Sequence, residues 1–367
     1  MDRRSFLKLA TIAAVTPAVV VDALRTSYPP PAKRLLQLNA YPLDAETPLD
    51  LLNTYITPND LFFMRSHFIA PRLNPDTWTL TVDGAVSRPM QLTLADLMKL
   101  PKAEATCVLQ CAGNGRSLFK PTMPGVQWRH GAVGNARWSG VRVKEVLERA
   151  GLKGSARHLH TFGSDVPPRQ VPPFHRSLEI EKVIQDGIIA FEMNSEPLWH
   201  EHGAPARLIV PGWAGDHWMK WLKRISPSPT PQSGFYMDTA YQHPSRPGNP
   251  ITELFVKSTI TSAPAKARAD APVTIRGFAF SGAPDIANVE VTEDEGHTWR
   301  SADLDSRHDP YAWRLWSYRW TPASAGVHRL MMRAIDSRGS MQPRDPVWNQ
   351  SGYLHNGWHS ITVEVQA

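Results

Sequence analysis

Residues 105–116 read Ala-Thr-Cys-Val-Leu-Gln-Cys-Ala-Gly-Asn-Gly-Arg, an apolar run that opens into a glycine-rich loop. The run from Ala105 to Gln110 is typical of a buried β-strand, and the glycines after it predict a turn. Cys107 is expected inside the strand as a small buried hydrophobe, whereas Cys111 stands where the strand opens. A thiol near an arginine, here Arg116, ionises more readily and can act as a nucleophile or a metal ligand. On this spacing alone, an isolated cysteine is more often structural than catalytic.

These two cysteines are the only ones in the chain of 367 residues. A disulfide framework, a four-cysteine zinc or iron–sulfur site within the chain, and a Cys-x-x-Cys-His haem attachment site are therefore excluded. The net charge of +6 suits an anionic substrate or an acidic partner. The basic residues are scattered and no nucleic-acid-binding motif is present, so nucleic acid is not an expected partner.

The sequence around the cysteines predicts a domain of mixed α and β structure. Trp78 to Gly84 alternates like a strand, and Thr93 to Pro101 reads as a short helix with a threonine cap and a proline stop. Val143 to Ala150 is an amphipathic helix closed by a glycine, and Leu208 to Val210 is a short β-rich run. We find no P-loop and no dinucleotide-binding glycine motif, so the pattern is not a regular βαβ repeat.

The last third of the chain predicts a different architecture. A loop rich in glycine, proline and serine runs from Gly234 to Asn249, and we place a domain boundary after it. Five short runs beyond it read as strands: Val273–Phe280, Asn288–Thr292, Trp313–Trp320, Val327–Ile335 and Trp358–Val365. Such spacing is typical of an immunoglobulin-like β-sandwich. The expected fold class is α+β, with a mixed α/β catalytic domain over residues 31–249 and a sandwich over residues 250–367. The sandwich would form a dimer or partner surface, or only stabilise its neighbour.

Residues 1–30 predict an export signal and the start of an extended arm that continues to about residue 50. Arg3 and Arg4 precede Ser-Phe-Leu-Lys and a mostly apolar run from Leu9 to Val21, which resembles a twin-arginine leader. As a helix this run spans about 20 Å, less than the roughly 30 Å of a bilayer core, so no permanent span is expected. No clean cleavage site follows, which leaves a membrane anchor open. The expected location is the periplasm.

Many short motifs follow the order seen in one enzyme family. They are Ile56-Thr57-Pro58-Asn59, Phe62-Phe63-Met64-Arg65-Ser66-His67, Leu109-Gln110-Cys111-Ala112-Gly113-Asn114, Ala136-Arg137-Trp138-Ser139-Gly140-Val141, Phe191-Glu192-Met193-Asn194, His202-Gly203-x-Pro205-x-Arg207, Pro211-Gly212, Lys220-Trp221-Leu222-Lys223-Arg224-Ile225, Trp348-Asn349 and Gly357-Trp358-His359. Over roughly residues 45–365 the chain resembles the sulfite oxidase family of molybdopterin-dependent oxidoreductases. The resemblance implies a molybdopterin-binding domain and a molybdenum cofactor. The metal would be held by Cys111, since a soft thiolate suits a metal that changes oxidation state.

The resemblance also implies which residues contact the cofactor. These positions are Phe63, Met64, Arg65, Ser66, His67, Cys111, Asp165, His202, Arg207, Trp218, Met219 and Lys220. Arg207 and Lys220 would hold the anionic phosphate of the pterin. Many relatives have an arginine before this lysine, whereas this chain has Asp216-His217-Trp218, so the local phosphate contacts are expected to differ.

A substrate pocket for the sulfite dianion needs converging cations. Arg65, His67 and Arg116 are the expected cations, and Trp128 is an expected apolar wall. By resemblance Tyr241, rather than Tyr236, supplies a hydroxyl that donates to the substrate or to a ligand of the metal.

The implied function is oxidation of sulfite to sulfate, with electrons passed to a periplasmic c-type cytochrome because the chain carries no haem motif of its own. The alternatives are a sulfane dehydrogenase-type subunit of a thiosulfate-oxidising system, an oxide reductase on the same scaffold, or a non-catalytic binding module. His200, Glu201 and His202 could belong to a zinc site, but no third ligand is evident. A homodimer, or a heterodimer with a cytochrome subunit, is the expected assembly.

Overall fold

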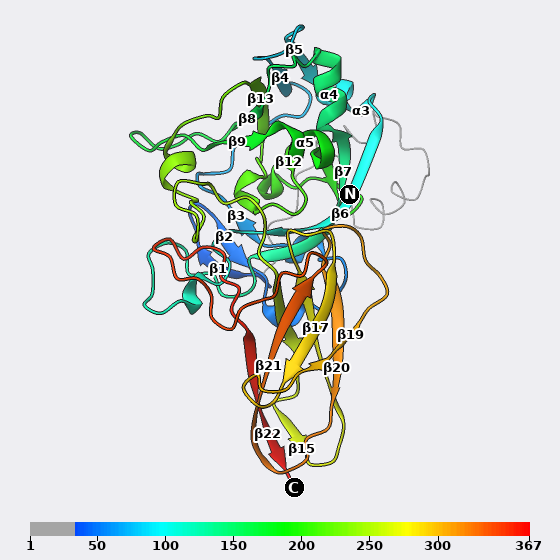
Figure 1. The fold of residues 1–367 in the computed structure, drawn as a ribbon. Coiled ribbons are helices and arrows are strands. Elements are labelled where there is room, and N and C mark those ends of the chain that lie inside the picture. Colours follow the sequence, from blue (N-terminus) through cyan, green and yellow to red (C-terminus); the bar gives the residue numbers. More distant parts are fainter. Residues whose placement is uncertain (1–33) are drawn as a thin grey trace.

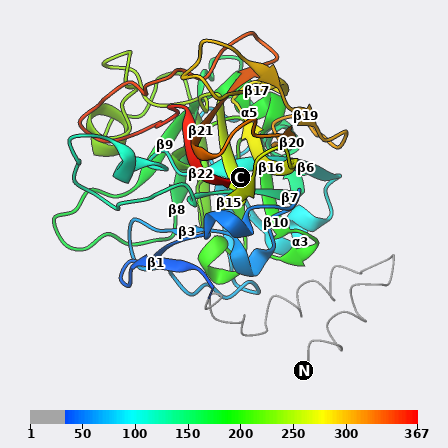
Figure 2. The ribbon, with the colours of Figure 1, turned by 90° about the horizontal axis from the view of Figure 1, so that it is seen from below.

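A computed structural model describes residues 34–367, so the expected leader lies outside the described residues. Figure 1 shows a broad α/β domain and, below it, an elongated β domain that ends at the C-terminus. Viewed from that end, strands β22 (His359–Gln366) and β15 (Lys266–Arg268) lie over the middle of the first domain (Figure 2). Within residues 34–367 no helix is long and apolar enough to cross a bilayer.

The first domain contains two large β-sheets. Their strands are β4 (Thr79–Val82), β5 (Met90–Thr93), β6 (Lys102–Gln110), β7 (Val133–Arg142), β8 (His158–Gly163), β9 (His175–Glu179), β10 (Ile188–Met193), β11 (Glu196–Pro197), β12 (Arg207–Ile209) and β13 (Leu222–Ser228). One sheet has the order β11-β10-β7-β6, with β12 also paired to β10, and the other has the order β5-β4-β13-β8-β9. Strand β6 contains the run predicted before Cys111 and is an edge strand of its sheet.

A third, small sheet replaces part of the arm that the sequence led us to expect. It joins β1 (Leu36–Asn39), β2 (Asp44–Glu46) and β3 (Met64–Arg65) in that order. The residues of β2 are all buried although two of the three are acidic. Pairing of β2 with β3 places Asp44 opposite Arg65, so the described part of the arm is folded against the first domain.

Short helices connect these strands. The α-helices are α3 (Leu94–Met98), α4 (Val143–Ala150) and α5 (Ile180–Asp186), and the 3₁₀ turns are η1 (Leu49–Leu51), η2 (Asn59–Leu61), η3 (Arg116–Leu118), η4 (His200–His202) and η5 (Gly215–His217). Helix α4 has the predicted bounds: Val143, Val146, Leu147 and Ala150 form its buried face, and Gly151 ends it with φ +70°. One prediction was wrong, because the loop expected from Gly234 contains a π-helical turn, η6 (Phe235–Thr239).

The second domain is the predicted β-sandwich. Its strands are β14 (Lys257–Ser262), β15, β16 (Val273–Phe280), β17 (Ile286–Thr292), β18 (Arg300–Ser301), β19 (Asp303–Leu304), β20 (Arg314–Trp320), β21 (Gly326–Asp336) and β22. One sheet has the order β14-β16-β20-β19 and the other β15-β22-β21-β17-β18. All five predicted strands are confirmed to within two residues, and so is the fold class.

The two domains share a hydrophobic cluster. Val108 and Val133 of the first domain pack in it with Phe278 and Trp313 of the second. The amide of Val108 also donates to the carbonyl of Tyr311 at 2.9 Å, which covers the outer edge of strand β6. The sandwich is therefore part of the environment of the cysteine loop and not a separate appendage.

Lys257 is a buried cation near this junction. It is 3% exposed, and its Nζ atom has no hydrogen-bond partner among the described residues. Burial lowers the pKa of Lys257 to about 7, and its charge in turn contributes to lowering the pKa of His130, His355 and His359. An unpaired buried ammonium destabilises a fold, so this lysine lowers the stability of the junction.

We therefore expect Lys257→Met to raise the free energy of unfolding by about 1–4 kcal/mol at pH 7, as removal of buried charges often does. The folded-state pKa lies below the unfolded value, so between about pH 7 and 10.5 the unfolded chain binds more protons at this site. The destabilisation of the wild type by the buried lysine thus becomes smaller as the pH rises, and the difference in the free energy of unfolding between Lys257→Met and the wild type should decrease. Chemical denaturation at several pH values checks this. Lys266→Met, an exposed lysine on the same domain, should change stability little; an equal gain there would contradict the argument.

Candidate active site

An open pocket of about 720 Å³ lies where the loops of the first domain converge. It is lined by Phe62, Phe63, Arg65, Ser66, His67, Leu109, Cys111, Ala112, Asp165, Phe174, Glu201, His202, Arg207, Gly215, Asp216, Trp218, Met219, Lys220, Trp221 and Tyr241. Its mixture of aromatic walls with a few polar groups is that of a cofactor or small-molecule site. All of the predicted cofactor residues except Met64 line it.

Cys111 lies at the exit of strand β6, as the sequence predicts. Its amide donates to the carbonyl of Ala132 at 3.0 Å, and its side chain reaches the pocket. Burial raises the pKa of the Cys111 thiol, and the charge of Arg65 opposes that shift. Cys107 is fully buried in the core, where burial raises its pKa far more strongly. Cys111 is therefore the thiol that can meet a ligand, and a bound metal would deprotonate it.

One end of the pocket holds two buried cations. Lys220 donates from Nζ to Ser66 Oγ at 2.8 Å and to the carbonyl of Glu201 at 2.9 Å. Arg207 donates to the carbonyl of His202 at 2.8 Å, and its Nε has no partner among the described residues. Burial, with the charge of Arg207 second, lowers the pKa of Lys220 to about 7, and burial lowers that of Arg207 to about 9. Neither forms an ion pair within residues 34–367, although the charge of Asp165, which also lines the pocket, opposes the lowering of the Lys220 pKa.

The other end brings Arg65, His67 and Tyr241 together. His67 Nε2 and the Tyr241 hydroxyl are 2.7 Å apart, and the imidazole stacks on Phe174 with centroids 4.0 Å apart. Burial and the charge of Arg65 hold the pKa of His67 well below its usual value, so the ring is neutral. Burial also raises the pKa of Tyr241, so its hydroxyl keeps its proton. This end offers one fixed cation and neutral hydrogen-bonding groups.

Three predicted residues do not reach this pocket. The Arg116 guanidinium donates to the carbonyls of Ser351 at 2.9 Å and Val126 at 3.0 Å, and it is not among the residues that line the pocket. Trp128 is fully buried and packs edge-on behind Phe63, with centroids 6.4 Å apart. Met64 is buried in strand β3 because its side chain alternates with that of Arg65. Their positions do not support the predicted contacts with substrate or cofactor.

The structure also adds residues that the sequence did not single out. Asp216 lines the pocket and pairs with Arg176, a fully buried residue of strand β9. The replacement of a basic residue by Asp216-His217 drew attention to this segment. Nothing in the local sequence of β9 marked Arg176, because an arginine in an alternating strand ordinarily faces solvent.

His200 and His202 do not belong to a cluster of metal ligands in the described residues. Within residues 34–367, no group of three or more His, Cys, Asp or Glu side chains is arranged to hold a metal ion. His202 lies against the carbonyl of Asn59 at 3.3 Å, and burial lowers its pKa to about 3. The geometry around His200 and His202 therefore gives no support to the zinc alternative.

Comparison with known proteins decides the family. The description "Oxidoreductase molybdopterin binding domain" matches residues 67–236, and "Mo-co oxidoreductase dimerisation domain" matches residues 249–366. Sulfite oxidase of Arabidopsis thaliana is 30% identical over 380 residues, which cover 92% of this chain and 96% of that protein. This chain belongs to the sulfite oxidase family.

Two further relatives fit this assignment. Mitochondrial sulfite oxidase of Mus musculus is 36% identical over 361 residues, and the match covers 90% of this family member but 66% of the mouse protein. The crystal structure of the sulfane dehydrogenase SoxCD from Paracoccus pantotrophus superposes with a TM-score of 0.79 and 28% identity, over 96% of both chains. The chain thus carries the two domains of this family, and its fold extends to relatives with different named activities.

The residues of this family member fit the molybdenum cofactor. The pocket presents one soft donor, Cys111, for the metal. At the other end, the buried and unpaired charges of Arg207 and Lys220 suit a phosphate group, because an anion would satisfy cations that the fold leaves without counter-ions. Within the part of the chain described, Asp165 is a carboxylate that acts on Lys220, but it forms no ion pair with either cation.

We expect Cys111→Ser to yield folded protein without oxidoreductase activity, because serine is a hard donor that cannot replace a thiolate on the metal. Cys107→Ser should retain the metal and lose about 1–3 kcal/mol of stability, since it places a hydroxyl in the core. Activity assays, elemental analysis and thermal unfolding of both variants check this. Equal loss of activity from the two folded variants would show that Cys111 has no special role.

Proposed function

We propose that this chain is a sulfite dehydrogenase that oxidises sulfite to sulfate. The observation that carries the proposal is the convergence of Cys111, Arg65, His67 and Tyr241 at one end of a pocket whose other end suits a phosphate. Identities of 30–36% to sulfite oxidases support sulfite as the substrate. The choice of sulfite over other sulfur compounds is part of the proposal.

The chemistry consumes sulfite and water and yields sulfate, two protons and two electrons. When bound, the molybdenum cofactor supplies the two-electron redox chemistry. Arg65 binds the anion through its charge, and its partial burial strengthens that attraction relative to a fully solvated site. Tyr241 donates its retained proton in a hydrogen bond toward the anion, and the neutral ring of His67 at 2.7 Å orients that hydroxyl. These side chains position the substrate, and they need no change in their own charge.

Location and electron acceptor belong to the same proposal. Arg3, Arg4 and the apolar run after them support export by the twin-arginine route to the periplasm. Because an exported enzyme has no access to cytoplasmic nicotinamide, we propose a periplasmic c-type cytochrome as the acceptor. Such encounters are brief and depend on ionic strength.

A second candidate function is oxidation of sulfane sulfur. The superposition on the sulfane dehydrogenase SoxCD, with a TM-score of 0.79 over 96% of both chains, is the observation that favours it. Asp216 also lines the pocket, and a carboxylate there is less suited to a dianion such as sulfite than a lining of cations alone.

The purified, molybdenum-loaded chain should reduce cytochrome c with sulfite, at a rate that changes with salt, and should not reduce NAD. Stopped-flow mixing of the sulfite-reduced protein with cytochrome c and with oxygen measures both steps. Glutathione persulfide, in place of sulfite, tests the second candidate. Turnover with the persulfide alone would replace sulfite as the substrate, and faster reoxidation by oxygen than by cytochrome c would make the enzyme an oxidase.

Arg65→Gln should lower kcat/KM for sulfite by about 10- to 100-fold, the loss of one charge-assisted hydrogen bond. The effect should be larger at low sulfite than at saturation, because binding of the anion is what the charge promotes. Arg72→Gln, which removes an exposed arginine, should leave kcat/KM nearly unchanged. Similar values for the wild type and Arg65→Gln would remove Arg65 from the substrate site.

A further inference from the structure

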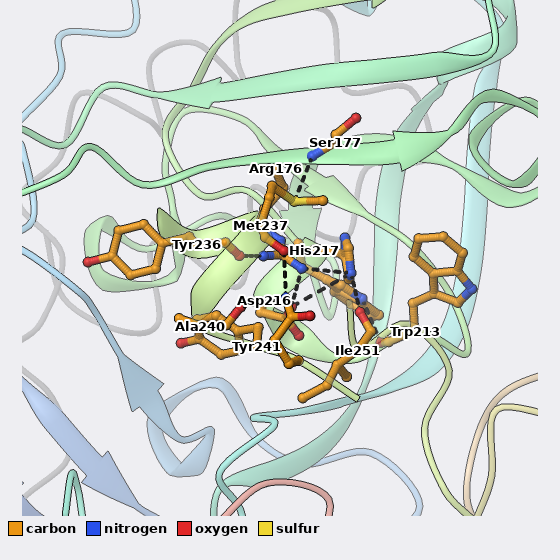
Figure 3. Close-up of polar contacts among 12 residues, drawn as sticks. Arg176, Ser177, Trp213, Asp216, His217, Tyr236, Met237, Ala240, Tyr241 and Ile251 are labelled. Atoms are coloured by element: carbon orange, nitrogen blue, oxygen red, sulfur yellow. Dashed lines mark hydrogen bonds and ion pairs between the residues drawn. The ribbon is translucent and has the colours of Figure 1, made fainter. Parts of the chain in front are cut away.

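Arg176 is a buried cation that the proposed chemistry does not use directly. It lies on strand β9 with a side chain 0% exposed, and it is not among the residues that line the pocket. Figure 3 shows it beside Asp216, His217 and Tyr236, with dashed lines for its polar contacts. A fully buried arginine needs a partner for its charge and its donors, so its contacts indicate what it holds.

The guanidinium joins three segments of the chain. Its Nη2 lies 2.8 Å from Asp216 Oδ2 and 3.1 Å from His217 Nε2, both in turn η5. Its Nη1 donates to the carbonyl of Tyr236, inside the π-helical turn η6. Its central carbon lies 5.4 Å from the centre of the Tyr241 ring, at cation–π distance. A planar guanidinium can meet the Asp216 carboxylate and the Tyr236 carbonyl at once, whereas an ammonium is a single point charge. His217 Nε2 does not accept from it, because its proton goes to the carbonyl of Ile251.

The backbone at Tyr241 depends on such contacts. Tyr241 has φ +56°, in the left-handed region that costs an ordinary residue about 1–3 kcal/mol. Its carbonyl accepts from the amide of Ile251 at 2.7 Å, and the carbonyl of Ile251 lies 2.6 Å from His217 Nε2, which donates to it. Tyr353 stacks on the ring at 4.9 Å. Arg176 therefore reaches Tyr241 directly through the ring, and through Asp216 it lies against turn η5, whose His217 donates to the carbonyl of Ile251.

The ion pair between Arg176 and Asp216 is better explained by a role in positioning neighbouring groups than by a contribution to stability. Burial lowers the pKa of Arg176 and raises that of Asp216 to about 7, and each charge opposes the shift of the other. Apolar replacements of such pairs are often neutral or stabilising, so stability alone does not account for the pair. Arg176 also balances the charge of Asp216, a carboxylate that would otherwise face an anionic substrate.

We propose that Arg176 is a positioning residue, which holds the Tyr241 hydroxyl at the substrate end of the pocket through the Tyr241 ring, the Asp216 carboxylate and turn η6. The inference rests on the proposed function, because it takes Tyr241 to be the residue that meets the substrate. Arg176 touches neither substrate nor cofactor, so its effect must pass through Tyr241.

A double-mutant cycle tests this with the molybdenum-loaded chain. Arg176→Met should lower kcat by at least about fivefold, and Arg176→Lys should lower it less, because the charge opposite Asp216 is kept. In the Tyr241→Phe background the same substitutions should lower kcat by less than about twofold, because the hydroxyl they position is gone. Molybdenum content and the midpoint of thermal unfolding are measured for every variant. Arg149→Met, an exposed arginine of helix α4, is the matched control.

Equal fold-losses from Arg176→Met with and without the Tyr241 hydroxyl would show a merely structural role and overturn the inference. If both Arg176 variants fail to fold, the ion pair is a structural requirement and the inference is equally overturned. Failure of the proposed function has a different signature, since the wild type would then not oxidise sulfite. The cycle is in that case run with the sulfur compound that the wild type does oxidise, and the same two results decide it.

Discussion

The position of Cys111 depends on hydrogen bonds along both edges of strand β6. Strand β7 pairs with one edge over the whole length of β6, and the carbonyl of Tyr311 accepts from Val108 on the other. Beyond the strand, the carbonyl of Ala112 accepts from Leu354 at 2.8 Å. An edge strand held on one side alone would fray at its end, which is where the thiol lies. The sandwich domain therefore contributes to the rigidity of the site although none of its residues lines the pocket.

The second constraint is charge. Arg65, Arg207 and Lys220 converge on one cavity, and desolvation is the largest effect on the pKa of each. Asp44 lies 3.4 Å from Arg65, and Asp165 acts on Lys220, but within residues 34–367 no carboxylate forms an ion pair with Arg207 or Lys220. A fold gains little stability by burying cations in this way, so this part of the cavity is best understood as a site that an anionic group completes. Asp216, on another wall of the pocket, has its own cation in Arg176.

Much of this could be predicted from the sequence, and the reasons are local. Helix α4 shows its buried face through its periodicity, and the strands of the sandwich show theirs through alternation and the turns between them. The choice of Cys111 over Cys107 follows from the point where an apolar run meets glycines. The remaining features depend on long-range packing. The π-helical turn η6, the bonds of Arg116 to Ser351 and Val126, and the pairing of Arg176 with Asp216 join segments that carry no mutual signal in the sequence.

The bond from Arg116 to Ser351 spans 235 residues of the chain, and it lies beside the loop that carries the thiol. The loop therefore reaches its final form only after the ribosome has made nearly all of the sandwich. Before the sandwich has been synthesised, the strand that leads to Cys111 lacks its contacts with that domain, and apolar residues such as Val108 lack their packing partners. The cysteine loop in the form seen here is accordingly a property of the completed two-domain chain, and a fragment that ends before residue 351 lacks one of the contacts that fix it.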